Sequence, residues 1–138
     1  MKEKYVYPQK VLLAWGECIK GNKEISEWLR NNGYKELFVF ALALRNEERA
    51  KEWLLKNGFP HLLAVVEGSE GQAKAIDWLR KNNFEALAML ALAGNGEEIG
   101  FHWLKNKKQL ELLFVAQKIR LLNEEIEEKN NNHHSMDF

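Results

Sequence analysis

The sequence predicts an all-α protein, an α-solenoid of about four 25-residue helix-turn-helix repeats closed by a long C-terminal capping helix. A column of tryptophan–leucine pairs and a column of single leucines both recur every 25 residues, and aligning them needs no gap between Val11 and Arg120. Two independent columns with one period are the signature of a repeat architecture. The columns are Trp28-Leu29, Trp53-Leu54, Trp78-Leu79 and Trp103-Leu104, and then Leu12, Leu37, Leu62, Leu87 and Leu112.

The first helix of each repeat carries the tryptophan. Ala50, Trp53 and Leu54 stand at positions i, i+3 and i+4 and therefore share one face of a helix. Three of these helices are expected to end at Asn32-Gly33, Asn57-Gly58 and Asn82-Asn83, because both residue types tolerate the left-handed conformation that closes a helix C-terminus. An aromatic residue follows, placed to pack back on that turn. The predicted structural core comprises Trp28, Leu29, Leu37, Trp53, Leu54, Leu62, Trp78, Leu79, Leu87, Trp103, Leu104 and Leu112.

The second helix of each repeat is apolar around more of its circumference, which indicates cover on more than one side. The N-terminal unit is a half, since residues 11–20 resemble only a second helix. At the other end, apolar residues from Leu112 to Ile126 follow one face of a long helix whose opposite face is charged, as a terminal cap requires. We expect one domain over residues 1–128, with repeats in 11–120, the capping helix at about 110–128 and a frayed polar tail at 129–138.

Composition excludes several classes of function. The 138 residues are 46% hydrophobic and carry 20 basic and 20 acidic side chains, so the chain can bury a core and has no net charge to capture nucleic acid or anionic lipid. The single cysteine cannot form an internal disulfide. The start, MKEKYVYPQK, lacks the apolar stretch of a signal peptide, and no apolar run is long enough for a membrane span. We expect a cytoplasmic protein.

The architecture resembles the α-solenoid class, which includes tetratricopeptide, ankyrin and HEAT-type arrays. The resemblance covers residues 11–120, and the motif W-L-x-x-N-[GN]-[YF]-x-x-L is similar to short αα-repeat proteins. The 25-residue period matches no named family of the class, since tetratricopeptide and ankyrin repeats are longer. What the resemblance implies is binding of another protein on an extended surface.

No motif for catalysis, for a metal or for a cofactor is found in the sequence, so we expect a protein that is not an enzyme and that needs no cofactor. His61 and His102 lie in different units, and a metal site needs several converging ligands. Cys18 falls in a column of small residues with Ala43, Gly68 and Ala93, so packing explains it. An enzyme with a pocket between repeats remains the lesser alternative.

Basic side chains two residues after the tryptophans are the candidate partner-binding residues, together with neighbouring lysines: Arg30, Lys56, Arg80, Lys81 and Lys105. Basic residues late in a helix also complement the helix dipole, which is the purely structural explanation. The preferred hypothesis is a non-catalytic scaffold or adaptor that binds a protein. The alternative is a nucleic-acid-binding helical-repeat protein, which the neutral net charge disfavours. The sequence predicts neither the partner nor the oligomeric state.

Overall fold

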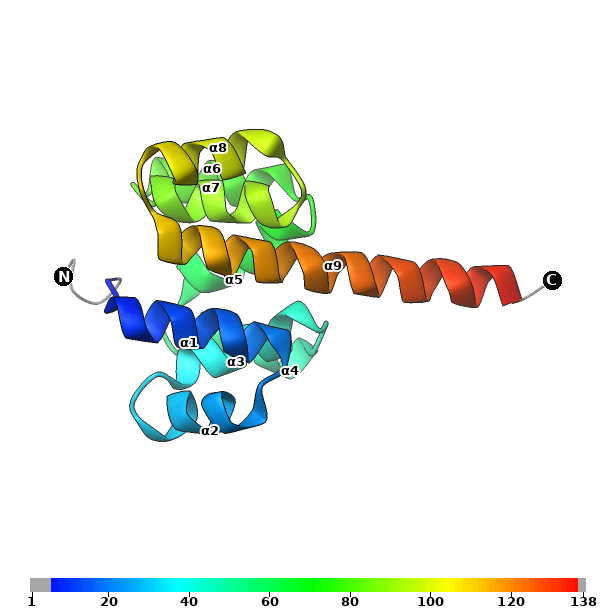
Figure 1. Ribbon diagram of the computed structural model, residues 1–138, viewed down its shortest axis with the longest axis horizontal. Coiled ribbons are helices and arrows are strands. Elements are labelled where there is room, and N and C mark those ends of the chain that lie inside the picture. Colours follow the sequence, from blue (N-terminus) through cyan, green and yellow to red (C-terminus); the bar gives the residue numbers. More distant parts are fainter. Residues whose placement is uncertain (1–5, 137–138) are drawn as a thin grey trace.

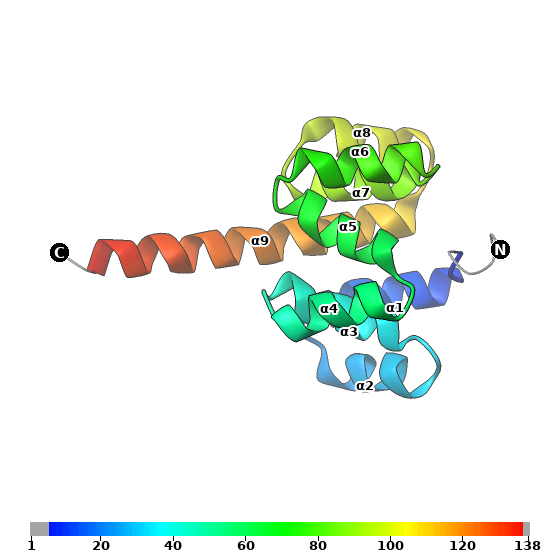
Figure 2. The same cartoon turned by 180° about the vertical axis from the view of Figure 1, so that it is seen from behind.

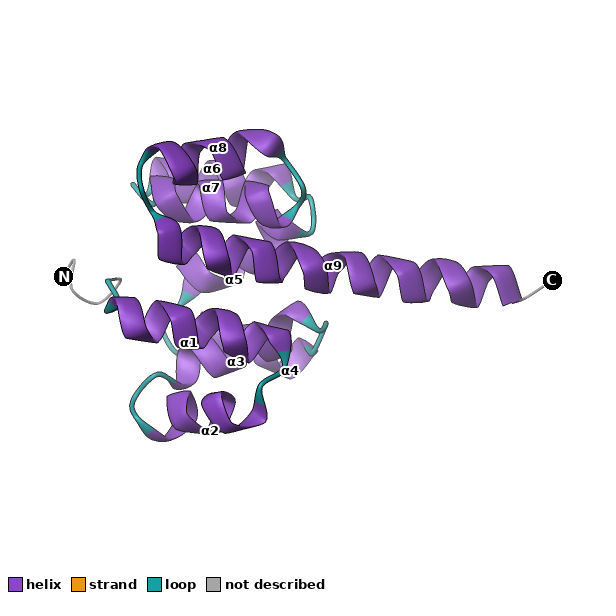
Figure 3. Ribbon diagram, viewed as in Figure 1, coloured by secondary structure: helices purple, strands orange, loops and turns teal. Residues whose placement is uncertain are grey.

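The computed structural model describes the backbone of residues 6–136 and the side chains of residues 6–131. Within this part, helices joined by short turns account for the whole structure and no strand occurs, which confirms the predicted all-α class (Figure 3). The helices are α1 (Gln9–Lys20), α2 (Lys23–Asn31), α3 (Lys35–Leu44), α4 (Glu48–Lys56), α5 (Pro60–Ser69), α6 (Ala73–Lys81), α7 (Glu85–Gly94), α8 (Glu98–Asn106) and α9 (Leu110–Met136).

The odd-numbered helices form an inner layer that closes on itself. Each packs against the next one in the series, and α9 packs along α1, beside which it lies in Figure 1. These contacts do not confirm the predicted α-solenoid arrangement: in the described chain the inner helices form a closed ring. The physical reason lies in the N-terminal half-unit: α1 has an unpaired side, and α9 buries its apolar face there.

The even-numbered helices form an outer layer around this ring. Each outer helix contacts the inner helices that precede and follow it in the chain. Figure 2 shows α4 and α6 on either side of α5 on the face opposite to α1 and α9. The leucine of each tryptophan–leucine pair inserts between the layers, and all four are 0% exposed: Leu29, Leu54, Leu79 and Leu104.

One residue from every inner helix belongs to a central column of completely buried core residues. These residues are again 25 apart, and none is more than 1% exposed: Trp15, Phe40, Val65, Leu90 and Val115. Full burial of an aliphatic or aromatic side chain stabilises a fold by about 1.5–3 kcal/mol. This central column therefore holds the five inner helices together.

Two series of left-handed residues set the lengths of the helices. Inner helices end at Gly21, Asn46, Gly71 and Gly96, and outer helices end at Gly33, Gly58, Asn83 and Lys108; every one has a positive φ. Glycine, and to a lesser degree asparagine, adopts this conformation without a steric penalty. The next position in the first series is Leu121, so α9 has no such stop and runs on.

The long C-terminal helix differs from the expected one at its end. Its backbone stays helical to Met136, so the predicted change from helix to frayed tail at residue 129 is corrected, and only residues 137–138 of that tail lie outside the description. The Asn123 amide donates hydrogen bonds of 3.2 Å to the carbonyls of Ser69 and Gly94, at the C-terminal ends of α5 and α7. None of the described helices combines the length and the apolar character needed to cross a bilayer.

Candidate functional site

The repeated motif after each tryptophan builds a helix end. The Asn57 amide donates to the carbonyl of Trp53 at 2.8 Å, and Asn82 does the same to Trp78. The backbone N–H of the following aromatic, such as Phe59, donates to the buried leucine's carbonyl. These bonds satisfy carbonyls that the last turn of a helix leaves without partners. The conserved spacing of this motif along the chain is thus explained by folding alone.

The tryptophans of the repeat lie at the surface of the outer layer. Trp28 and Trp78 are 36% and 38% exposed, while Trp53 and Trp103 are partly buried. The prediction that Trp28 and Trp78 belong to the core is wrong. The indoles of Trp28, Trp53 and Trp78 instead stack on the aromatic that follows their helix; for Trp53 and Phe59 the ring centres are 5.9 Å apart. Lysine ammonium groups also lie over two of the rings, Lys10 at 5.5 Å from the Trp28 ring centre and Lys35 at 5.2 Å from that of Trp53.

The leucine ladder of the inner helices is divided between the core and a cavity. Leu37 and Leu62 are almost completely buried and Leu112 is 8% exposed, as expected for core residues. Leu87 and Leu12 are only partly buried. The difference arises because the ring does not fill its own centre at the N-terminal ends of the inner helices.

The basic side chains predicted to bind a partner do not form one continuous surface charge. Arg30 lies 3.5 Å from Glu27, and Arg80 lies 3.4 Å from Glu85, so both are paired within the chain. Lys56, Lys81 and Lys105 are exposed. Exposed ion pairs contribute only about 0–1 kcal/mol. The paired arginines reduce the net charge that this edge could offer to an acidic partner or to nucleic acid.

Exposed apolar side chains lie on α1 and α9, the two neighbouring inner helices that share no described outer helix. We call this surface the α1–α9 face and define it by Leu13, Leu110, Phe114 and Leu121. Leu13, Leu110 and Leu121 are 46%, 58% and 52% exposed, and Phe114 is partly exposed. Figure 1 views this side of the molecule, with α1 and α9 flanked by α2 at the bottom and α8 at the top. Within residues 6–136, five inner helices are thus covered by four outer ones.

Comparing residues 25 positions apart shows how an outer helix would change the exposure of this face. Phe38 is the counterpart of Leu13, and it is partly buried beneath α2, whose Arg30 guanidinium lies 5.7 Å from the Phe38 ring centre. In the described part of the chain no outer helix packs before α1, and Leu13 is 46% exposed. Phe114 packs directly on Gly16, where a Cβ would clash with its ring, and this contact keeps α9 close to α1.

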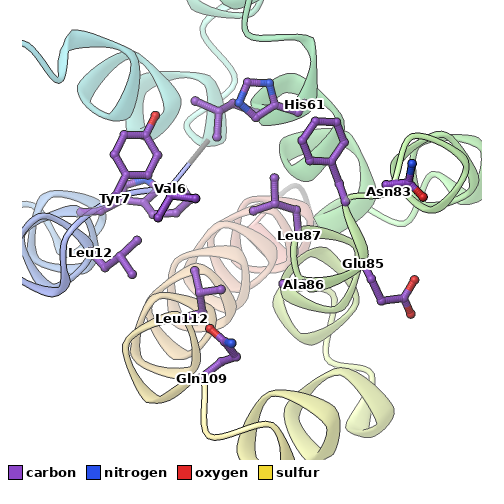
Figure 4. Close-up of a pocket in the computed structure, with 13 residues that line it drawn as sticks. Val6, Tyr7, Leu12, His61, Asn83, Glu85, Ala86, Leu87, Gln109 and Leu112 are labelled. Atoms are coloured by element: carbon purple, nitrogen blue, oxygen red, sulfur yellow. The ribbon is translucent and has the colours of Figure 1, made fainter. Parts of the chain in front are cut away.

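A cavity of about 390 Å³ opens at the end of the ring where the inner helices begin. Figure 4 shows its side chains converging from α1, α5, α7 and α9. Its walls are mainly apolar and include four members of the leucine ladder, Leu12, Leu62, Leu87 and Leu112. Trp15 and His61 also line it, and both are buried.

One side of this cavity is closed by a hydrogen bond between Tyr7 and Glu36. The Tyr7 hydroxyl donates to the Glu36 carboxylate at 2.8 Å, and Glu36 is only 9% exposed. Burial raises the pKa of the Tyr7 phenol well above its ordinary value, and the nearby Glu36 carboxylate raises it further. The pair ties the segment before α1 to the start of α3.

The cysteine and the histidines that were considered as functional residues make contacts that folding alone explains. Cys18 is buried and accepts a hydrogen bond from the Ser26 hydroxyl at 3.1 Å; burial raises the pKa of its thiol, which keeps the less reactive protonated form. The exposed His102 lies 3.4 Å from Glu98 on the same helix, and His61 stacks on Phe84. Across the residues whose side chains are described, no three metal-ligating groups come together.

Trp15, Tyr7 and Leu13 were not among the residues predicted from the sequence to form the core or a binding site. Trp15 could have been found, because it shares a 25-residue column with Phe40, Val65, Leu90 and Val115. Comparison of the chain with protein families, curated proteins and solved structures gave no match. Its function must therefore be inferred from its own residues.

Proposed function

We propose that this chain is a non-catalytic protein-binding module that takes an amphipathic helix of a partner protein into the α1–α9 face. The single observation that carries the proposal is the incomplete outer layer: the described chain supplies four outer helices for five inner ones. The exposed leucines of the α1–α9 face occupy the place where the fifth outer helix would lie. An apolar groove between parallel helices is a common receptor for a helix.

The four outer helices indicate which partner fits. Each lies across two inner helices and inserts one completely buried leucine between them. In three of the four, a small residue four positions earlier lets the helix approach closely: in α8, Gly100 sits so near to the backbone of Ala93 that a side chain there would clash. A partner helix with a small residue and a leucine at i and i+4 would present the same face.

The chain does not provide this helix from its own described C-terminus. The positions that would carry the small residue, the tryptophan and the leucine of a fifth outer helix hold Glu125, Glu128 and Lys129. All three are exposed on α9, which continues straight instead of turning back. The α1–α9 face is therefore left open in the described part of the chain.

The predicted partner-binding residues form what we call the basic edge: Arg30, Lys56, Arg80, Lys81 and Lys105. This edge is a weaker candidate for a docking surface than the α1–α9 face. Two of its members, Arg30 and Arg80, are engaged in ion pairs with the chain's own glutamates. A partner would have to replace those pairs, with little net gain in a high-dielectric surface environment. The same pairing weakens the nucleic-acid alternative, which depends on free positive charge.

Binding can be tested with a fluorescein-labelled peptide of residues 46–58, the sequence of α4 with its two turns. The protein's own α4 is tethered beside its site, so the free peptide cannot displace it and must use the vacant position. We expect saturable binding in fluorescence anisotropy. Leu13→Glu and Leu121→Glu should each weaken it by about tenfold or more, because a charge would enter an apolar contact.

The matched control is Leu55→Glu, which places the same charge at an equally exposed leucine of α4 and should leave binding unchanged. A peptide in which Leu54 is replaced by glutamate should not bind. Equal binding by the parent and by Leu13→Glu would refute the proposal. Weakened binding only on reversal of Arg30, Arg80 and Lys105 to glutamate would move the site to the basic edge.

A further inference from the structure

The outer helices show which groups meet the residue three positions before each buried leucine. In α4 this residue is Lys51, and its ammonium lies 3.7 Å from the Glu70 carboxylate. Glu70 stands at the end of α5, the inner helix that follows α4. The two side chains are 17% and 30% exposed, so the ion pair is partly shielded from water. The residue at this position therefore reaches the end of the next inner helix.

In α2 the same position contacts the inner helix that comes before it. The Ser26 hydroxyl donates to Cys18 Sγ of α1 at 3.1 Å. The counterparts of Cys18 in α3, α5 and α7 are small and buried, which leaves room for the crossing helix: Ala43, Gly68 and Ala93. The residue three before the leucine thus lies between the preceding and the following inner helix.

A helix on the α1–α9 face would follow α9 and precede α1 in the ring, as α4 follows α3 and precedes α5. By the 25-residue repeat, Lys20 at the end of α1 is the counterpart of Glu70. Lys118 of α9 is the counterpart of Cys18. Lys20 is exposed and Lys118 is partly exposed. Two positive charges therefore flank the point that this residue of a docked helix would reach.

Lys20 differs from the other basic residues at its position in the repeat. Arg45 donates a hydrogen bond of 3.2 Å to the Ile19 carbonyl, and Arg120 forms an ion pair with Glu124 at 3.1 Å. Among the side chains that the structure describes, none pairs with Lys20. Its ammonium group is therefore available to a carboxylate of a partner.

The chain's own outer helices do not carry the charge that these lysines favour. Three positions before the leucine they have Ser26, Lys51, Ile76 and Phe101, none of them acidic. Lys51 would bring a third positive charge to Lys20 and Lys118, and neighbouring like charges repel one another. A glutamate or aspartate would instead form ion pairs with the two lysines. The charges therefore favour a different protein over a second copy of this chain as the occupant.

We propose that the α1–α9 face selects a partner helix with an acidic residue three positions before its leucine, and binds this carboxylate through Lys20 and Lys118. This inference rests on the proposed function. It narrows the partner to a helix with a small residue, an acidic residue and a leucine at positions i, i+1 and i+4. Complementary charges of this kind determine which partner binds more than how tightly it binds.

The test compares the labelled peptide of residues 46–58 with the same peptide carrying Lys51→Glu, by fluorescence anisotropy at low ionic strength. We expect the parent protein to bind the Lys51→Glu peptide about three- to tenfold more tightly, because repulsion becomes attraction. Lys20→Glu should reduce this preference, and Lys20→Glu combined with Lys118→Glu should reverse it. Lys56→Glu is the matched control, because it changes another exposed lysine, at the end of α4, and it should preserve the preference.

Measuring the same two peptides against every protein cancels any difference in their own helicity. Lys20→Glu changes an exposed residue, so it tests the proposal even if the double variant fails to fold. The proposal is overturned if both peptides bind the parent equally well, or if the preference for glutamate is unchanged in Lys20→Glu. Binding of neither peptide, or binding that Leu13→Glu does not weaken, would refute the proposed function and this inference with it.

Discussion

The covered and the uncovered parts of the inner ring are built from the same repeat, yet their surfaces differ. Over α3, α5 and α7, outer helices on both sides bury the outward apolar residues, such as Phe38. On α1 the residue equivalent to Phe38, Leu13, stays exposed, and on α9 Leu121 is exposed as well. Where outer helices cover an inner helix on both sides, the repeated apolar residues stabilise the fold. Where one outer helix is absent, we propose that the exposed apolar residues bind a partner.

The largest expected contrast is between two leucines. Leu54→Ala in the covered part should destabilise the protein by about 2–5 kcal/mol, because it empties a completely buried site. Leu13→Ala on the α1–α9 face should change stability by less than about 1 kcal/mol, since Leu13 is already half exposed. Urea denaturation of both variants measures the contrast. Equal losses would mean that the α1–α9 face is part of the core.

The next effect concerns Tyr7, which joins the segment before α1 to α3. Tyr7→Phe should cost about 1–3 kcal/mol at neutral pH, because the buried Glu36 carboxylate loses its donor. The raised pKa of Tyr7 means that only the unfolded chain ionises near pH 10, so the stability linked to the phenol is present below that pH and is lost as pH rises above it. Chemical denaturation from pH 7 to 11 should show this loss in the parent and not in Tyr7→Phe. A parallel decline in both proteins would argue against a neutral, buried phenol.

A smaller effect is expected for the exposed tryptophans. Trp78→Ala removes a stack on Phe84, with ring centres 6.1 Å apart, and part of a buried surface. Since such a stack contributes about 0.5–1.5 kcal/mol beyond burial, the total loss should be about 1–3 kcal/mol and below that of the neighbouring Leu79→Ala. Thermal and urea denaturation test the order. A tryptophan loss larger than the leucine loss would restore Trp78 to the core.

The smallest expected effect concerns Leu121, at the position where the earlier inner helices end. Leu121→Gly restores the residue type that ends the earlier inner helices and should cost about 1 kcal/mol. It should also reduce the helical circular-dichroism signal, because α9 is no longer held continuous past residue 121. Leu121→Ala is the control and should keep the signal. If glycine and alanine give the same spectrum, the missing left-handed residue is not what prolongs α9.

Local rules made part of this structure predictable from the sequence. The leucines after each tryptophan and the Asn-Gly turns depend on contacts within one or two neighbouring helices, and both are where the pattern placed them. The closure of the ring was not predictable in this way, since it depends on the fit of Phe114 against Gly16, residues far apart in the chain. The exposure of Trp78 was misjudged because an apolar face at helical spacing does not show how deep each residue lies.

The candidate sites were harder to foresee for a related reason. The basic column was visible as a pattern, but the pairing of Arg80 with Glu85 depends on the geometry of the turn after α6. The α1–α9 face consists of residues that resemble core residues in the repeat and are exposed only because a covering helix is absent. The sequence pattern identifies the apolar residues of each repeat. Only the assembled structure shows which of them remain exposed because no helix packs over them.

The most direct test of the central proposal is a ¹H–¹⁵N titration of the protein with the peptide of residues 46–58. The incomplete outer layer predicts that the perturbed backbone signals cluster on Leu13, Leu110, Phe114 and Leu121, with the covered residue Phe38 unaffected. Perturbations confined to the basic edge or to the cavity, or spread evenly over the ring, would contradict a docking site for a helix on the α1–α9 face.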